Sequence, residues 1–208
     1  MNLDQYIEAH TSPADLLLDE LVRYTHLHTM NPRMLSGHIQ GRLLAMFSAM
    51  IQPRRILEIG TFTGYATLCL AKGLAPGGEI HTIERNDELH DTLCSFFRRS
   101  PQANQIKLHI GNALDLIPTF HETFDLVYID GDKREYTAYY HAVFDKVRNG
   151  GYIMADNVLW DGKVTADPLP NDVQTQNIMA FNDLVRDDER VENLLLPLRD
   201  GLMIIQKK

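Results

Sequence analysis

Short apolar runs alternate with helical stretches from residue 55 onward, and this alternation leaves few folds open to the chain. Five runs are predicted to be strands: Arg55–Ile59, Ile80–Glu84, Ile106–Ile110, Phe124–Asp130 and Tyr152–Asp156. Helical segments follow most of them, near residues 64–74, 87–98, 113–118 and 136–147. Because strands that alternate with helices pair in parallel through right-handed crossovers, the sequence predicts an α/β fold with a doubly wound sheet.

The C-terminal end of the chain departs from this pattern. Two apolar runs, Glu192–Leu198 and Leu202–Gln206, are separated only by Arg199-Asp200-Gly201, and Asp-Gly is typical of a hairpin turn. Strands joined by a hairpin are antiparallel. We therefore expect seven strands with the last one reversed, which differs from an ordinary dinucleotide-binding fold.

Two helices are expected ahead of the sheet. The first covers residues 12–28, with Ser12 as its cap, Pro13 at its first position and Asp15 in its first turn. The second runs from about Ser36 to Met50. All 208 residues are predicted to form a single domain, 1–208, which is long enough to bury a full core.

Charge and composition exclude several classes of protein. A formal net charge of −8 argues against a broad surface for nucleic acid or anionic membrane. The first residues have neither the basic region nor the apolar run of a signal peptide, and no apolar stretch approaches the roughly 20 residues of a membrane helix. The two cysteines, Cys69 and Cys94, lack CxxC spacing. We expect a soluble cytoplasmic protein.

The first predicted strand runs directly into a turn with two glycines, Gly60 and Gly64. Glycines at a strand-to-helix turn let a ligand approach backbone amides at the helix N-terminus, although such a pair is as often structural. The spacing is not the G-x-G-x-x-G that surrounds a pyrophosphate. Glu84 ends the second strand, where a carboxylate can bind ribose hydroxyls. Together these features predict a nucleoside cofactor.

Acidic residues end the next two strands. Asp130 closes the fourth strand, and Asp156 with Asn157 closes the fifth. One such acid could simply cap the following helix, but two clusters on successive parallel strands meet at one sheet edge. The atoms that these residues can offer to a metal are all oxygens, which suits a hard cation such as Mg²⁺. No HExxH motif, CxxC pair or histidine cluster favours zinc.

Four segments resemble a known family. Glu58–Tyr65, the D-x-D-K run Asp130–Lys133 and the D-N-x-L-W run Asp156–Trp160 resemble class I S-adenosylmethionine-dependent methyltransferases. Met34–Gly41 resembles the segment of that family that closes over the methionine end of the cofactor. Among these the closest similarity is to cation-dependent O-methyltransferases, which include caffeoyl-CoA and catechol O-methyltransferases. The resemblance covers roughly residues 30–208. It implies a Rossmann-like methyltransferase fold with added N-terminal helices, a homodimer, S-adenosyl-L-methionine and a divalent cation, expected to be Mg²⁺.

The resemblance also implies which residues contact the cofactor. They are Ser36, Glu58, Gly60, Thr61, Tyr65, Ala66, Glu84, Ala113 and Asp130. Ser36 and Glu58 would contact the methionyl part, Glu84 the ribose, and Ala113 lies where the family approaches the adenine. Ala66 departs from the family, because many members place there a serine that bonds the cofactor carboxylate.

The implied metal ligands are Asp130, Asp156 and Asn157, with Asp130 and Lys133 in catalytic positions. Lys133 stands where catechol O-methyltransferases keep their base. Asp132 is either a carboxylate that orients this group or a solvent-exposed residue.

A stretch without periodicity, residues 157–172, follows the fifth strand, and long loops of this kind are usually functional or disordered. Trp160, the only tryptophan, either walls an aromatic acceptor or anchors the loop to the core. Asp161 stands where plant enzymes of the family have a substrate-contacting asparagine, which leaves the acceptor open.

The implied reaction is methyl transfer to a hydroxyl oxygen. An in-line displacement needs a deprotonated oxygen, and a phenol with a pKa of about 10 needs help to ionise at neutral pH. A cation supplies that help and clamps two adjacent oxygens, so a vicinal dihydroxy aromatic small molecule fits best. Some family members instead methylate a hydroxylated uridine in transfer RNA, against which the negative charge counts. A non-catalytic cofactor-binding protein would lack a ligand residue, and the glycine spacing disfavours a nicotinamide dehydrogenase.

Overall fold

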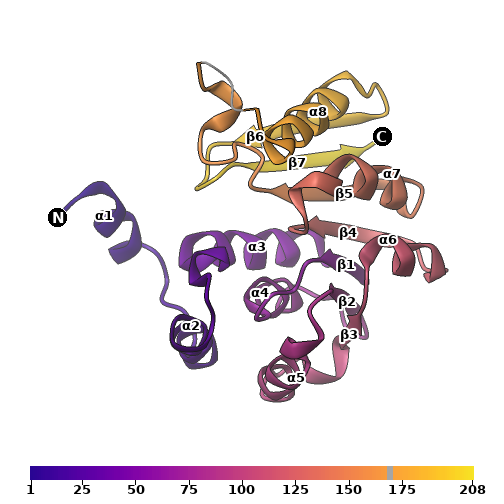
Figure 1. Ribbon diagram of the computed structural model, residues 1–208. Coiled ribbons are helices and arrows are strands. Elements are labelled where there is room, and N and C mark those ends of the chain that lie inside the picture. The colour runs from indigo at the N-terminus through magenta and orange to yellow at the C-terminus, as the bar shows by residue number, and fades with distance from the viewer. Residues whose placement is uncertain (168–170) are drawn as a thin grey trace.

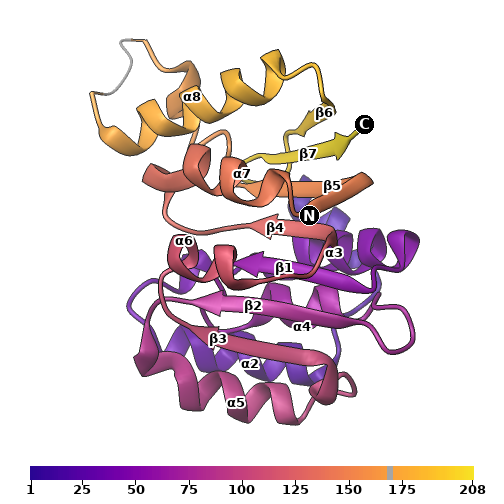
Figure 2. The ribbon, with the colours of Figure 1, turned by 90° about the vertical axis from the view of Figure 1, so that its right-hand side faces the viewer.

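The computed structural model describes residues 1–167 and 171–208. Seven strands form one sheet in the order β3-β2-β1-β4-β5-β7-β6 (Figure 2). They are β1 (Arg55–Ile59), β2 (Glu79–Glu84), β3 (Ile106–Ile110), β4 (Phe124–Ile129), β5 (Val147–Asp156), β6 (Val191–Leu196) and β7 (Leu202–Lys207). Strands β1 to β5 pair in parallel, whereas β7 pairs antiparallel with both β5 and β6. The predicted sheet with a reversed last strand is confirmed.

Helices cover both faces of this sheet (Figures 1 and 2). One face carries α2 (Leu16–His28), α3 (Gly37–Ile51), α4 (Tyr65–Ala71) and α5 (His90–Arg98). The other carries α6 (Ala113–Leu116), α7 (Tyr136–Phe144) and α8 (Val173–Asp187). Single 3-10 turns are η1 (Pro32–Met34), η2 (Asp87–Leu89), η3 (Ala103–Gln105), η4 (Ile117–Thr119), η5 (Lys133–Glu135) and η6 (Lys163–Thr165). No helix in the described part of the chain is both long and apolar enough to cross a bilayer.

The N-terminal region differs from the prediction. A separate short helix, α1 (Leu3–Ala9), precedes α2 and buries none of its residues. The expected cap at Ser12 is wrong: α2 begins at Leu16, and the Asp15 carboxylate accepts a hydrogen bond from the Leu18 amide at 2.9 Å. Asp15 also forms an ion pair with Lys72, the C-cap residue of α4, so a contact distant in sequence fixes where the helix begins.

Side chains along the central strands alternate between the two faces of the sheet. This alternation gives two separate apolar cores and also puts several polar groups on one face. In β1, Ile59 joins the core that includes α7 and α8, whereas Ile56 joins the core that includes α2, α3 and α4. Glu58 shares the second face because side chains alternate along a strand. Its register partners are Thr82 in β2 and Tyr128 in β4. A row of polar side chains therefore lies beneath the helices of the α3 face, close to the strand ends.

Candidate functional site

The turn between β1 and α4 lies directly against the end of β4. Gly60 has φ +91°, and a Cβ there would lie 2.3 Å from the carbonyl oxygen of Asp130, so only glycine fits. Gly64 has φ +93°, and its missing Cβ makes room for the ring of Phe97 on α5. Both glycines therefore have a packing role, and the first also brings the turn into contact with the predicted metal ligand.

Glu84 holds this turn in place from the end of β2. Its Oε2 accepts hydrogen bonds from the amides of Thr61 at 3.2 Å and Phe62 at 2.7 Å. Its Oε1 accepts one from the Asn86 amide at 2.8 Å, and its carbonyl accepts one from the Gly111 amide at 2.8 Å. The carboxylate and the loop are thus brought together, as the sequence predicts.

Glu58 is a fully buried carboxyl group with one unsatisfied oxygen. Its Oε2 accepts hydrogen bonds from the hydroxyls of Thr67 and Thr82, the latter at 2.6 Å. Its Oε1 has no hydrogen-bond partner among the described residues. Burial raises the pKa of Glu58 to about 8 against the effect of the two hydroxyls, and the charges of Asp130 and Glu84 add to the rise. A ligand that brings a donor or a positive charge would satisfy this oxygen.

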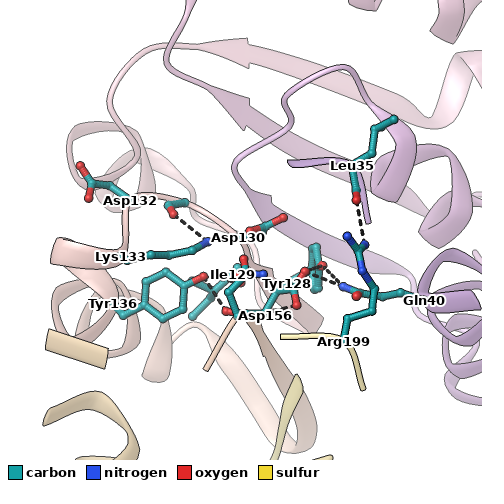
Figure 3. A network of polar contacts seen from close by, with 12 residues as sticks. Leu35, Gln40, Tyr128, Ile129, Asp130, Asp132, Lys133, Tyr136, Asp156 and Arg199 are labelled. Carbon is teal, nitrogen blue, oxygen red and sulfur yellow. Dashed lines mark hydrogen bonds and ion pairs between the residues drawn. The ribbon is translucent and has the colours of Figure 1, made fainter. Parts of the chain in front are cut away.

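Asp156, at the end of β5, is held from several sides (Figure 3). Its Oδ2 accepts hydrogen bonds from the Gln40 amide and from the Tyr128 hydroxyl, the latter at 2.9 Å. Its Oδ1 accepts one from the Asn157 amide at 2.8 Å, and its carbonyl accepts one from the Tyr136 hydroxyl at 2.8 Å. Both the backbone and the carboxylate of this residue are therefore fixed.

The partly buried Asp130 and the buried Lys133 form an ion pair beside Asp156. The Nζ of Lys133 donates to Asp130 Oδ1 at 2.8 Å and to the Gly131 carbonyl at 3.2 Å, and the lysine is only 8% exposed. Burial raises the pKa of Asp130 to about 6; Lys133 opposes this rise and the charge of Asp156 adds to it. Burial lowers the pKa of Lys133, but the charge of Asp130 outweighs it and keeps that pKa above the usual value.

The donors at this edge suit a hard divalent cation. No group of three or more His, Cys, Asp or Glu side chains is arranged as a metal site among the described residues. The expected set of metal ligands contains only two carboxylates, Asp130 and Asp156. The third ligand would be the side-chain amide oxygen of Asn157. The charge of Asp156 raises the pKa of Asp130, so a cation placed between the two would relieve their repulsion. Oxygen ligands of this kind fit Mg²⁺.

The segment after the metal residues has an unusual backbone. Asn157, Trp160 and Asp161 all have positive φ, at 59°, 48° and 56°. Such conformations persist where surrounding structure enforces them, often at functional sites. Here the β6–β7 turn does so, because the amides of Leu159 and Asp161 donate to the carbonyl and carboxylate of Asp200. Residues 168–170 of the expected long loop lie outside the described residues.

Two residues on this segment, Trp160 and Asp161, are expected to contact the methyl acceptor, and their environments differ. Trp160 packs against the core that includes α7 and α8, which favours the anchoring interpretation, and its Nε1 has no hydrogen-bond partner in the described chain. Asp161 is exposed. Asp132 caps η5 through the Arg134 amide at 3.0 Å and pairs with the Arg134 guanidinium, so it serves the turn itself.

The remaining expected cofactor residues lie around the same edge. Ser36 is buried at the start of α3, and its carbonyl accepts a hydrogen bond from the Arg199 guanidinium. Tyr65 and Ala66 open α4, with the tyrosine ring against Gly41 of α3. Ala113, also buried, begins α6 directly after the β3 end.

The sequence reasoning gives no role in the site to four residues of the network: Gln40, Tyr128, Tyr136 and Arg199 (Figure 3). Tyr128 carries a usable signal, because it is a polar-tipped residue two positions before Asp130 and lies between the apolar residues Val127 and Ile129. Gln40 and Arg199 lie on a helix and a turn whose contacts with the site join segments more than a hundred residues apart.

Comparison with known proteins agrees with this geometry. The sequence model of the O-methyltransferase family matches residues 8–208. Caffeoyl-CoA O-methyltransferase 1 of Nicotiana tabacum is 29% identical over 201 residues, which cover 91% of this chain and 84% of the relative. The O-methyltransferase from Bacillus cereus, solved in complex with SAH, has a TM-score of 0.91 and 31% identity over 99% of this chain and 97% of its own.

A second solved structure is TomG from Streptomyces achromogenes, an O-methyltransferase involved in tomaymycin synthesis, in complex with SAM. It has a TM-score of 0.90 and 28% identity over 99% of this chain and 96% of its own. The family match, which extends over nearly the entire sequence, and the seven-stranded sheet lead to one assignment: this chain belongs to the O-methyltransferase family.

Proposed function

We propose that the protein transfers a methyl group from S-adenosyl-L-methionine to one hydroxyl of a small aromatic acceptor with two adjacent oxygens. The observation that carries this proposal is that the expected cofactor residues and the expected metal ligands lie at the same edge of the sheet. The unsatisfied oxygen of Glu58 and the carboxylate of Glu84 lie beside the β1–α4 turn. The β1–α4 turn contacts the backbone of Asp130, and the charge of Asp156 raises the pKa of Asp130.

The cofactor would lie along the β1–α4 turn. Glu84 would accept hydrogen bonds from the ribose hydroxyls, as a carboxylate ending the second strand does in related nucleotide sites. The free oxygen of Glu58 would receive the ammonium group of the methionyl part, with Ser36 nearby at the start of α3. Ala113 would face the adenine. The two solved relatives, described with bound SAH and SAM, support this choice of cofactor.

The cofactor set also includes Gly60, Thr61, Tyr65, Ala66 and Asp130. The turn residues would offer backbone amides, because no side chain at Gly60 blocks the approach of a ligand. Ala66 offers no hydroxyl, so the cofactor carboxylate would depend on backbone groups and on Ser36.

Asp130, Asp156 and Asn157 would hold the cation. A bound divalent cation lowers the pKa of a coordinated hydroxyl and fixes its orientation. The protein's own part is to hold the acceptor oxygen in line with the methyl group and to manage its proton. Lys133, hydrogen-bonded to Asp130 and buried, would as a charged group stabilise the deprotonated acceptor oxygen. It would accept the proton itself only if a cation bound beside Asp130 lowered the lysine pKa that the charge of Asp130 raises.

A vicinal dihydroxy aromatic is the proposed acceptor class. Two adjacent oxygens can occupy neighbouring positions on one cation, and the curated relatives named as caffeoyl-CoA O-methyltransferases support this class. Trp160 and Asp161, on the segment after the metal residues, are the proposed acceptor contacts.

A turnover screen with labelled S-adenosylmethionine tests the proposal. Catechol, caffeoyl-CoA and bulk transfer RNA would be compared, each with Mg²⁺ and with chelator. We expect label in at least one dihydroxy aromatic, only when Mg²⁺ is present. Labelled transfer RNA with unlabelled small acceptors would contradict the proposed acceptor, and label that persists in chelator would contradict the role of the cation.

A further inference from the structure

Gln40 is a buried polar residue that the proposed chemistry does not yet use. It lies one turn after Ser36 on α3 and is 1% exposed. Its Nε2 donates to Asp156 Oδ2 and to the Tyr128 hydroxyl at 3.1 Å. A buried amide normally satisfies its hydrogen bonds, so contact alone would not be unusual. Its position between two parts of the site is the informative feature.

The first part is the carboxylate of Asp156. With Gln40 and Tyr128 both donating to Oδ2, that oxygen is occupied, and the carboxylate cannot rotate without breaking two buried hydrogen bonds. Among the residues that the structure describes, only the backbone amide of Asn157 donates to Oδ1. A carboxylate oxygen that accepts one hydrogen bond has room for a second partner, so Oδ1 is the oxygen of Asp156 that remains for a cation.

The second part is the turn that precedes α3. Its carbonyls, from Leu35 at 2.7 Å and from Ser36, accept hydrogen bonds from the guanidinium of Arg199 on the β6–β7 turn (Figure 3). The proposed function places Ser36, in this turn, beside the methionyl end of the cofactor, and we call Leu35–Ser36 the cofactor-covering turn. Gln40 follows on helix α3, so the cofactor-covering turn and the metal carboxylate are joined by a single helical turn.

Helix α3 packs closely against α4 directly after Gln40. A Cβ on Gly41 would lie 2.5 Å from the Tyr65 ring and 2.9 Å from the sulfur of Cys69, both on α4. Further along, the Ser48 hydroxyl donates to the Leu70 carbonyl at 2.6 Å. Because close-packed helices shift as units rather than deform, a movement at Ser36 would be passed on to Gln40.

We infer that Gln40 is a positioning residue that fixes Asp156 for the cation and couples it to the cofactor-covering turn. The inference rests on the proposed function. It predicts that the cofactor and the cation strengthen each other's binding, because coupling between two sites is reciprocal. Tyr128 should help to fix Asp156 without carrying the coupling, because it lies on β4 and not on the helix.

Cation titrations test this inference without turnover. The affinity for Mn²⁺ would be measured by electron paramagnetic resonance, with and without saturating S-adenosylhomocysteine, for wild type, Gln40→Met and Tyr128→Phe. Methionine keeps the length of glutamine and removes its donor. The matched control is Gln176→Met, an exposed glutamine on α8. Thermal unfolding would confirm that each variant is folded.

In wild type, S-adenosylhomocysteine should tighten Mn²⁺ by about 5-fold or more. Gln40→Met should weaken Mn²⁺ by about 10–100-fold and reduce the effect of S-adenosylhomocysteine to near 1-fold. Tyr128→Phe should weaken Mn²⁺ but keep the wild-type effect, and Gln176→Met should match wild type throughout.

Two results would overturn the inference alone: a Gln40→Met protein that keeps the wild-type coupling, or a wild type that binds both ligands independently. A wild type that binds S-adenosylhomocysteine but no Mn²⁺ would overturn the proposed cation site and, with it, the inference.

Discussion

Replacing Glu58 by glutamine should make the cofactor-free protein progressively more stable relative to wild type as the pH rises. Burial raises the pKa of Glu58 from its ordinary 4.5 to about 8, so the folded state holds a proton that the unfolded state releases. The carboxyl group therefore makes stability fall as the pH rises from near 4.5 to about 8, with no further loss above that range. Glutamine does not titrate and removes this dependence.

The size of the effect follows from the two pKa values. At about 1.4 kcal/mol per pKa unit, the cost of the carboxyl group is about 1 kcal/mol at pH 5, 3 kcal/mol at pH 7 and 5 kcal/mol at pH 9. The new amide leaves an unpaired group where Oε1 lies, which costs about 1–3 kcal/mol at every pH. The robust quantity is thus the change in the difference between variant and wild type, about 4 kcal/mol from pH 5 to pH 9.

Urea unfolding of wild type and Glu58→Gln at pH 5, 7 and 9 measures this change. The same variant should bind S-adenosylhomocysteine more weakly, because the charge that would receive the ammonium group is gone. A stability difference that stays constant from pH 5 to pH 9 would refute the reasoning, since the buried carboxyl would then have the same pKa in both states.

Three further predictions concern the cofactor, the base and the assembly. Glu84→Ala should weaken S-adenosylhomocysteine by about 1–3 kcal/mol in isothermal titration, through an unpaired ribose hydroxyl; wild-type affinity would disprove the proposed ribose position. Lys133→Ala should keep cation and cofactor binding while turnover falls by about 10²–10⁴-fold. That deficit should shrink as the pH rises toward the pKa of the acceptor, and a constant deficit would mean that Lys133 only positions the acceptor. Light scattering should give a homodimer, the commonest oligomer, and a mass near 23.8 kDa would contradict it.

The sheet and the strand-end residues could be predicted because both depend on local patterns. Apolar runs mark the strands, and parallel strands bring their carboxyl ends to one edge whatever covers the faces. That geometry alone places Gly60, Glu84, Asp130 and Asp156 at the same edge. The reversed β7 likewise follows from the short turn at Arg199-Asp200-Gly201.

The errors arise where a distant contact decides between local alternatives. Ser12 and Asp15 can both cap a helix, and the ion pair of Asp15 with Lys72 is invisible in the local sequence. Strand β5 begins at Val147 rather than Tyr152, because Val147 pairs with Phe124 of β4 and the chain continues as a strand through Gly150, with φ +70°, where the glycines indicate a turn.

Two helices, α1 and α8, are absent from the prediction, the first because it has no apolar signal and the second despite having one. α1 buries nothing, so it leaves no apolar stripe to detect. α8 does have a stripe, in which Ile178, Phe181 and Val185 recur at helical spacing and are fully buried. Gln40 and Arg199 are harder, since their roles depend on which side of α3 faces β5 and on where the β6–β7 turn lies.

The dependence of methyl transfer on Mg²⁺ tests the central claim most directly. Protein treated with chelator would be titrated with Mg²⁺ in the presence of labelled S-adenosylmethionine and catechol, for wild type, Asp156→Asn and Asp132→Asn. The last is a matched control, because asparagine can still cap η5. Wild type and Asp132→Asn should regain turnover with Mg²⁺, whereas Asp156→Asn should stay inactive at the same concentrations. Equal turnover by the chelated wild type, or full recovery of Asp156→Asn, would contradict the account.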